Sequence, residues 1–360
     1  MRILLLARYG RLGASSRVRF EQFLPHFQAA GHEVVSAPLF DDEYLTALYD
    51  EGRRKTTAVL AAYANRLGVI RTRGHYDLVW MEKEALPWMP ASFEAWLLRG
   101  GPPMIVDYDD AIFHRYDQHP SPLIRGLLHS KIDRVMEAAS VVVAGNDYLA
   151  GRAREAGARR VEVLPTVVDL NRYRAPAPAN DGPPVIGWIG TPLTGPYLEE
   201  IRETLAGFAD TGAAKLMLIG AGDEVLPGVA AERVAWREDS EATDISRLDI
   251  GIMPIPDEPF ERGKCGYKLI QYMAQGRPVV ASPVGVNVRL VKDARAGFLA
   301  STRQEWWDAL LKLISDPLLR REMGTNGRRE VERKYCVDVI APELIRLFRE
   351  VAAQGESARR

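Results

Sequence analysis

Two lysines four residues apart lie at the start of a helix-patterned run. A polar loop ends in Gly263-Lys264-Cys265-Gly266, and the run from Tyr267 to Gln275 carries Lys268. A helix N-terminus preceded by small residues offers backbone N–H groups and the positive end of the helix dipole. We therefore predict that Lys264, Lys268 and the N–H groups from Cys265 through Gly266 to Tyr267 bind a phosphate. The alternative is a pair of solvated surface lysines.

A second glycine-bearing loop can close that phosphate site from the other side. It reads Gly190-Thr-Pro-Leu-Thr-Gly195 and follows the apolar segment 185–189. Its candidate ligand groups belong to Gly190, Thr191 and Thr194, which offer hydroxyls and backbone N–H groups. The alternative is an ordinary turn between a strand and a helix.

A cluster of carboxylates, Asp107-Tyr-Asp109-Asp110, follows the apolar segment 104–106. One interpretation is a DxD metal site, in which carboxylates hold a divalent cation against a diphosphate. A second places Asp109 and Asp110 at the carboxyl end of a strand, where one of them orients or deprotonates a hydroxyl. The third is a helix cap. His114 is open to the same functional and structural interpretations.

The elements that must position these residues alternate between strand and helix patterns. Apolar segments such as 3–7, 77–81, 104–106, 140–144, 185–189, 215–219, 250–254 and 279–281 are predicted strands. They are separated by helix-patterned stretches, which indicates doubly wound parallel sheets. Pro25 should bend or divide the first helix, which Ser15 or Ser16 is expected to cap near Arg17. We expect a last helix from Pro342 to Ala353.

Composition limits the function classes. The chain has 360 residues, 47% of them hydrophobic, which is enough for roughly two cores of about 150 residues. Its net charge of −1 argues against nucleic acid as a partner. Two cysteines give no disulfide framework or zinc cluster, and no apolar run reaches membrane-span length. A reducing cytoplasm is the expected location.

The clearest linker is the Pro/Ala/Gly/Asp run 175–184. It divides the chain into a first domain, 1–174, and a second, 185–337, with a cleft predicted between them. The segment 53–73 is rich in basic residues and is either a solvated helix pair or a face toward an anionic acceptor or a membrane surface.

The order of elements, the segment Pro165-Thr-Val-Val-Asp169 before the linker, and above all KLIQYMAQGRPVVASPVGVN resemble family-4-type (group 1) glycosyltransferases of the GT-B fold. The resemblance covers essentially the whole chain. It implies that residues 338–360 return to the first, acceptor-side domain. It also implies transfer from a nucleoside-diphosphate sugar with retention of configuration, without a metal or other cofactor, and a donor held mostly by the second domain.

The sequence departs from the common family pattern of two glutamates eight residues apart. Gln271 stands at the second of these positions and Gly263 at the first, so the chain resembles an atypical branch. Gln271 can still exchange hydrogen bonds with a ribose. In the same domain Trp236 can stack on a base or pack in the core, and the backbone at Gly285 can reach the sugar.

The acceptor-side candidates follow predicted strands of the first domain. Gly13 and Ser16 lie in the first loop, where backbone can approach a sugar closely. Arg17 and Arg19 face an anionic acceptor or are helix-surface arginines, and Lys83 and Glu84 line an acceptor pocket. The acceptor itself is a saccharide, a lipid-linked molecule or a small molecule, and a lipid-linked one implies peripheral contact at the inner face of the membrane.

The sequence thus predicts a GT-B glycosyltransferase of glycan, polysaccharide or glycolipid biosynthesis, with Asp109, Asp110 and Lys268 as its catalytic candidates. Two alternatives stay open at this point. One is a sugar-nucleotide epimerase or hydrolase on the same fold. The other is a degenerate subunit that binds a nucleotide sugar without turning it over.

Overall fold

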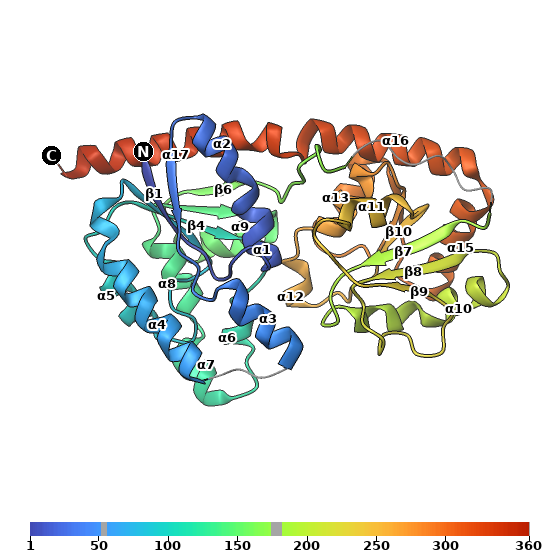
Figure 1. The fold of residues 1–360 in the computed structure, drawn as a ribbon, viewed down its shortest axis with the longest axis horizontal. Helices are drawn as coiled ribbons and strands as arrows, with labels where there is room; N and C mark the ends of the chain where they lie inside the picture. Colours follow the sequence, from blue (N-terminus) through green and yellow to red (C-terminus); the bar gives the residue numbers. More distant parts are fainter. Residues whose placement is uncertain (52–55, 174–181, 360) are drawn as a thin grey trace. The chain divides into compact units, whose positions relative to one another are not determined.

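The computed structural model describes residues 1–51, 56–173 and 182–359 (Figure 1). The chain divides into two compact units. Unit 1 comprises Met1–Thr166 and Ile340–Arg360, and unit 2 comprises Val167–Val339. The predicted linker 175–184 lies mostly outside the described residues, and only 182–184 of it are seen. None of the described helices has the length and apolar character that crossing a bilayer requires.

Unit 1 is built on a six-stranded sheet with the order β2-β1-β3-β4-β5-β6, and every pairing in it is parallel. Its strands are β1 (Arg2–Leu6), β2 (Glu33–Ser36), β3 (Leu78–Glu82), β4 (Met104–Tyr108), β5 (Val141–Ala144) and β6 (Val161–Val163). Its helices are α1 (Ala14–Arg19), η1 (Glu21–Phe23), α2 (Leu24–Ala29), α3 (Asp42–Glu51), α4 (Thr56–Arg71), η2 (Arg73–His75), α5 (Ala91–Leu98), α6 (His114–Asp117), α7 (Pro122–Leu128), α8 (Lys131–Ala138) and α9 (Asp147–Glu155). Glu82 at the end of β3 lies beside Asp107 of β4, so the loops after these strands start together.

Unit 2 repeats the same architecture with the order β12-β11-β10-β7-β8-β9, again all parallel. Its strands are β7 (Val185–Ile189), β8 (Lys215–Ile219), β9 (Glu232–Val234), β10 (Ile250–Met253), β11 (Val279–Ala281) and β12 (Gly297–Leu299). Its helices are η3 (Gly195–Ile201), α10 (Arg202–Asp210), α11 (Glu241–Ser246), α12 (Pro259–Arg262), α13 (Tyr267–Ala274), α14 (Asn287–Ala294), α15 (Arg303–Ser315) and α16 (Pro317–Lys334). The loops after β7 and β10 therefore start at neighbouring points of one sheet edge.

Alternate residues of each unit 2 strand enter different cores. Val185 and Ile189 of β7 belong to one buried cluster, and Ile186 and Trp188 belong to another. Because successive side chains of a strand point to opposite faces, both faces of the sheet are covered by helices. This explains why the strands read as nearly continuous apolar runs, and it confirms the doubly wound class.

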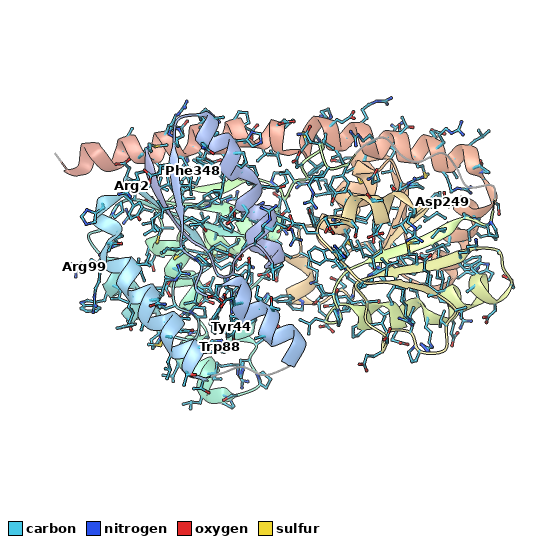
Figure 2. The ribbon with its side chains drawn as sticks, viewed as in Figure 1. Arg2, Tyr44, Trp88, Arg99, Asp249 and Phe348 are labelled. Atoms are coloured by element: carbon cyan, nitrogen blue, oxygen red, sulfur yellow. The ribbon has the colours of Figure 1, made fainter. Side chains whose placement is uncertain are left out.

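The last helix, α17 (Val337–Arg359), enters unit 1 from Ile340 onward. Its Phe348 packs edge-to-face against Phe27 and Trp80, with ring centroids 5.0 Å apart in both pairs (Figure 2). The helix is longer than predicted, because Pro342 lies inside it rather than at its start. The carboxyl-terminal segment of the protein thus completes the core of unit 1.

The first helix also differs from the prediction in one respect. Pro25 does divide it, and stands in the first turn of α2 after the short η1. The expected serine cap is wrong, however: α1 begins after Gly13, with no side-chain hydrogen bond at its cap. The Ser16 hydroxyl is buried and donates instead to Glu82 Oε2 at 2.7 Å. The buried carboxylate of Glu82 therefore accepts the hydrogen bond of Ser16, which does not cap the helix.

Candidate functional site

In unit 2 the predicted phosphate site centres on Lys268, in the first turn of α13. Its Nζ lies 4.2 Å from the ring centroid of Trp188 and 3.4 Å from Thr194 Oγ1. Burial, with a further contribution from the charge of Lys264, lowers the pKa of Lys268 to about 7. The pKa falls because desolvation and a like charge both disfavour the ammonium form. The side chain is thus a half-buried amine whose charge an incoming anion would stabilise.

The loop after β7 brings backbone close to that amine. A Cβ at Gly190 would collide with the indole of Trp188 and lie 2.7 Å from Lys268 Nζ. Thr194 closes the loop, since its Oγ1 donates to the Thr191 carbonyl at 3.2 Å and lies 3.3 Å from the Thr191 N–H. Gly190 and Thr194 are therefore close to Lys268, and Thr191 is joined to Thr194; that this loop closes a phosphate site stays a prediction.

Lys264 lies in the loop before α13 and contacts two aromatic rings. Its Nζ is 5.2 Å from the centroid of Phe260 and 5.8 Å from that of Tyr197. Tyr197 donates to Glu261 Oε1 at 2.5 Å. The sequence reading treated this loop as irregular, whereas residues 259–262 form the short helix α12, which holds Phe260 under Lys264.

Two loops of unit 2 require glycine: the turn into α13 and the loop between β11 and α14. Gly266 adopts φ +67°, and a Cβ there would collide with Leu290. Gly285, at φ +54°, would place a Cβ 2.6 Å from the carbonyl oxygen of Arg262. Left-handed backbone of this kind suits glycine, which has no Cβ. Cys265, directly before Gly266, is buried and not part of a disulfide.

Gln271, Trp236 and Tyr267 are held within the unit rather than standing free. Gln271 is buried, and its Nε2 donates to the Tyr173 hydroxyl at 3.0 Å. That hydroxyl donates to Glu241 Oε1 at 3.2 Å, and Trp236 Nε1 donates to Glu241 Oε2 at 2.8 Å. Tyr267 and Trp236 pack against the same hydrophobic cluster. Sequence reasoning missed Tyr173 and Glu241, because nothing in the spacing links them to Gln271.

In unit 1 the two candidate aspartates share one lysine. Lys83 Nζ lies 2.8 Å from Asp109 Oδ1 and 3.1 Å from Asp110 Oδ2, and donates to Ser15 Oγ at 3.3 Å. The Lys83 backbone adopts φ +62°, which turns the side chain toward the aspartates. Both carboxylates are thus paired with an ammonium, and their action on an acceptor hydroxyl stays a prediction. The sequence placed Lys83 and the aspartates at strand ends but did not pair them.

Charge in this cluster is fixed by the ion pairs. Burial alone would raise the pKa of Asp109, but the ammonium of Lys83 outweighs it and lowers that pKa. Burial disfavours the Lys83 charge as well, yet Asp109, Asp110 and Glu82 raise its pKa above the ordinary value. Both groups are therefore ionised at neutral pH. One acceptor remains: Asp110 Oδ1 is buried and has no hydrogen-bond partner among the described residues.

Other predicted acceptor residues serve the interior of unit 1. Glu84 is fully buried, pairs with Lys131 at 2.7 Å and accepts from the Tyr116 hydroxyl at 2.9 Å. The prediction that its carboxylate lines an open pocket is therefore wrong. His114 lies between Asp117 Oδ1 at 2.9 Å and the Tyr148 hydroxyl at 2.8 Å. His114 is thus held by side chains at both ring nitrogens and is not the helix cap of the structural interpretation, since α6 has no side-chain hydrogen bond at its cap.

The two arginines of α1 are also internal. Arg19 makes a two-pronged ion pair with Asp107 at 2.9 and 3.1 Å and donates to the Leu164 carbonyl, so it is not a surface arginine. Arg17 is buried, with Nη1 3.4 Å from the Arg11 carbonyl. Gly13, at the cap of α1, would place a Cβ 2.5 Å from that of Tyr9. It is required for packing of the first loop.

Among the residues the structure describes, no three His, Cys, Asp or Glu side chains come together as a metal-ligand set. Asp107, Asp109 and Asp110 are each engaged by a basic side chain, Arg19 or Lys83. The position that a cation would take between Asp109 and Asp110 is thus filled by an ammonium.

The chain resembles known proteins over both units. Residues 185–316 match the model of the family described as "Glycosyl transferases group 1". A D-inositol 3-phosphate glycosyltransferase from Nocardioides is 26% identical over an alignment of 336 positions that covers 79% of this chain and 69% of that protein. A phosphatidyl-myo-inositol mannosyltransferase from Mycobacterium leprae is 34% identical over 92 residues, a quarter of this chain and 24% of that protein. Four curated relatives, this one included, are matched over at most 28% of their own length.

Solved structures extend the similarity to nearly the whole chain. Anabaena HepE in complex with UDP-glucose superposes with a TM-score of 0.73 at 18% identity, covering 97% of this chain and all of that one. Sucrose-phosphate synthase from Thermosynechococcus elongatus gives a TM-score of 0.71 at 17% identity, covering 98% of this chain and all of that one. The chain therefore has the GT-B fold, and its residues 185–316 resemble the group 1 glycosyltransferases.

Proposed function

We propose that this protein is a glycosyltransferase that moves a sugar from a nucleoside-diphosphate sugar to an acceptor hydroxyl. The observation that carries the proposal is the site around Lys268. It combines a half-buried amine, a glycine loop without Cβ atoms in the way and a second lysine. All of these residues lie in the segment that matches group 1 glycosyltransferases.

The chemistry of the leaving group explains why such a site suits the reaction. As the glycosidic bond to the diphosphate breaks, negative charge grows on the departing oxygen. Cations and N–H dipoles aimed at that oxygen stabilise the transition state more than the ground state. Lys268 and Lys264 supply the charge, and the backbone of Gly190 and the first turn of α13 supply dipoles.

The Lys83 cluster of unit 1 supplies the acceptor-side chemistry in this proposal. Asp109 is held ionised, while Asp110 keeps one oxygen without a hydrogen-bond partner in the described chain. A carboxylate oxygen with spare acceptor capacity can orient a hydroxyl and draw on its proton as it attacks. Since the Lys83 ammonium already stands between the two carboxylates and offsets one of their charges, we propose that the reaction proceeds without a bound metal or other cofactor.

Relatives narrow the substrate class. The structures of HepE hold UDP, UDP-glucose or UDP with glucose, which supports a uridine-linked donor for this chain. Two relatives are named for inositol compounds, a D-inositol 3-phosphate glycosyltransferase and a phosphatidyl-myo-inositol mannosyltransferase, whereas three others are a mannosyltransferase, a trehalose synthase and a kanosaminyltransferase. We therefore place the reaction in glycan or glycolipid synthesis, with retention of configuration as the family resemblance implies. A cytoplasmic location with peripheral membrane contact stays a prediction.

A donor panel tests this function. The protein is incubated with UDP-, GDP- and ADP-linked sugars, with and without candidate saccharide or lipid-linked acceptors, and released nucleotide and sugar are measured separately. We expect one donor to give nucleotide release that needs an acceptor, and NMR of the product to show the anomer of the donor. Release of free sugar alone would indicate a hydrolase, and inhibition by EDTA would contradict the metal-free mechanism.

A further inference from the structure

A second cavity lies in unit 1 at the opposite end of the sheet from Lys83 and the aspartates. It has a volume of about 510 Å³ and is lined at its base by Val79, Met104 and Ser140, where β3, β4 and β5 begin. Lys83 and Asp109 follow the carboxyl ends of β3 and β4. Five residues of strand separate the two ends, which is roughly 17 Å. The cavity is therefore distinct from the candidate active site.

Four arginines line this cavity: Arg73, Arg99, Arg134 and Arg159. They come from η2, the end of α5, α8 and the turn after α9. The last three are exposed, and within the described part of the chain none of these three side chains has an ion-pair partner. Figure 2 shows Arg99 at the periphery of the molecule, near the end of α5. Unpaired like charges repel, so their convergence favours an anionic ligand.

Arg73 is fixed in the cavity wall. Its Nη1 donates to the Ile70 carbonyl at 3.0 Å and its Nη2 to the Arg99 carbonyl at 2.9 Å. Its Nε is buried and has no hydrogen-bond partner among the described residues. Gly101 leaves room for it, since a Cβ there would lie 2.6 Å from that Nε. A buried N–H without a partner is costly, and a bound acceptor would satisfy it.

The single carboxylate of the lining, Glu94, does not balance these charges. It is buried and accepts from the N–H groups of Ala85 and Leu86 at 2.8 and 3.2 Å, and it lies 3.5 Å from Lys131 Nζ. Its charge is thus engaged on the far side by groups outside the cavity. Apolar side chains such as Leu98 and Val135 complete the wall.

We infer that this arginine-lined cavity is a second ligand site, which binds a phosphorylated molecule with apolar surface next to its phosphate. Guanidinium groups match phosphate geometry with two parallel hydrogen bonds, and volumes of 300–1,000 Å³ are typical of small-molecule sites. The phosphate is carried either by a soluble metabolite or by a lipid headgroup. The inference does not rest on the proposed function, because none of these residues belongs to the donor or acceptor site.

The experiment uses inorganic pyrophosphate as the probe and removes the first phosphate site beforehand. Calorimetric titration is done on the full-length Lys264→Ala/Lys268→Ala variant, alone and with Arg99→Ala/Arg134→Ala added. The matched control adds Arg154→Ala/Arg321→Ala, two exposed arginines outside the cavity, and so removes the same charge. Both arginine pairs are on the surface, so equal melting temperatures will check that the fold is intact.

We expect the lysine variant to bind pyrophosphate, the cavity substitutions to weaken that binding about tenfold or more, and the control substitutions to leave it within about twofold. Equal weakening by cavity and control pairs, or no binding to the lysine variant, overturns the inference. If the proposed donor site is wrong instead, the lysine variant will bind as the native protein does and the arginine comparison still decides. Sedimentation with phosphatidylglycerol vesicles, with phosphatidylcholine vesicles as the control, separates the two sources of the phosphate. If the lysine variant sediments and the cavity variant does not, the phosphate belongs to a lipid headgroup. If neither of these two proteins sediments, it belongs to a soluble molecule.

Discussion

The pKa of Lys268 leads to a specific pH dependence for nucleotide binding. In the free protein, burial and Lys264 hold this pKa at about 7, against 10.5 for an ordinary lysine. A diphosphate placed beside Nζ favours the charged form, so binding takes up a proton above neutral pH. At pH 7 about half of the free protein carries the Lys268 charge, and at pH 9 about one part in a hundred does. The dissociation constant of a nucleoside diphosphate should therefore rise roughly 50-fold between these pH values.

Isothermal calorimetry with UDP at pH 7, 8 and 9 measures this effect directly. Titration in two buffers of different ionisation enthalpy gives the number of protons taken up, which should approach one per UDP at pH 9. Lys268→Arg is the matched control, since a guanidinium stays charged throughout this range. Its UDP affinity should be nearly flat between pH 7 and 9. A flat profile for the native protein, or the same slope in the arginine variant, would refute the assignment of Lys268 to the phosphate.

Three further predictions concern single side chains. Gly190→Ala should weaken UDP binding at least about tenfold, because the methyl group meets Trp188 and the ammonium of Lys268, whereas Gly182→Ala, with open space around it, should not. Lys83→Met should destabilise the protein by roughly 3–5 kcal/mol in urea unfolding, because the buried carboxylate of Asp109 loses its counter-charge, and Lys83→Arg should lose clearly less. Lys268→Met should raise the melting temperature while abolishing UDP binding. The folded-state pKa of Lys268 is lowered, so the unfolded chain holds its proton more tightly between pH 7 and about 10.5 and the native protein gains stability as pH rises there. The advantage of the methionine should accordingly be largest below pH 7 and vanish near pH 10.5; a constant difference would contradict the titration.

Much of the fold could be read from the sequence because its signals are local. Apolar runs such as 185–189 are buried on both faces, and Pro25 divides a helix wherever it lies. Lys264 and Lys268 are four residues apart at the start of α13, so that both lie at this helix end follows from their spacing. The helix boundary at Val337 was not predictable in this way. Pro342 lies inside α17, where contacts such as those of Phe348 offset its cost.

The acceptor-side site was harder to predict, because its contacts join distant segments. Lys83 meets Asp109 and Asp110 only because β3 and β4 are neighbours in register. The adjacency of the two strand ends could have predicted that Lys83 lies near a carboxylate. The charge of Lys83 alone does not predict which carboxylate it contacts. Glu84, the next residue along the chain, is buried and contacts Lys131 and Tyr116 instead. Such burial depends on α8, which no local pattern connects to this loop.

The most direct test of the central claim is a crystal structure with UDP, or with whichever nucleoside diphosphate the donor panel identifies. The β-phosphate is predicted to lie within hydrogen-bond distance of Lys268 Nζ and beside the backbone of Gly190. A nucleotide bound away from both Lys264 and Lys268 would contradict the account.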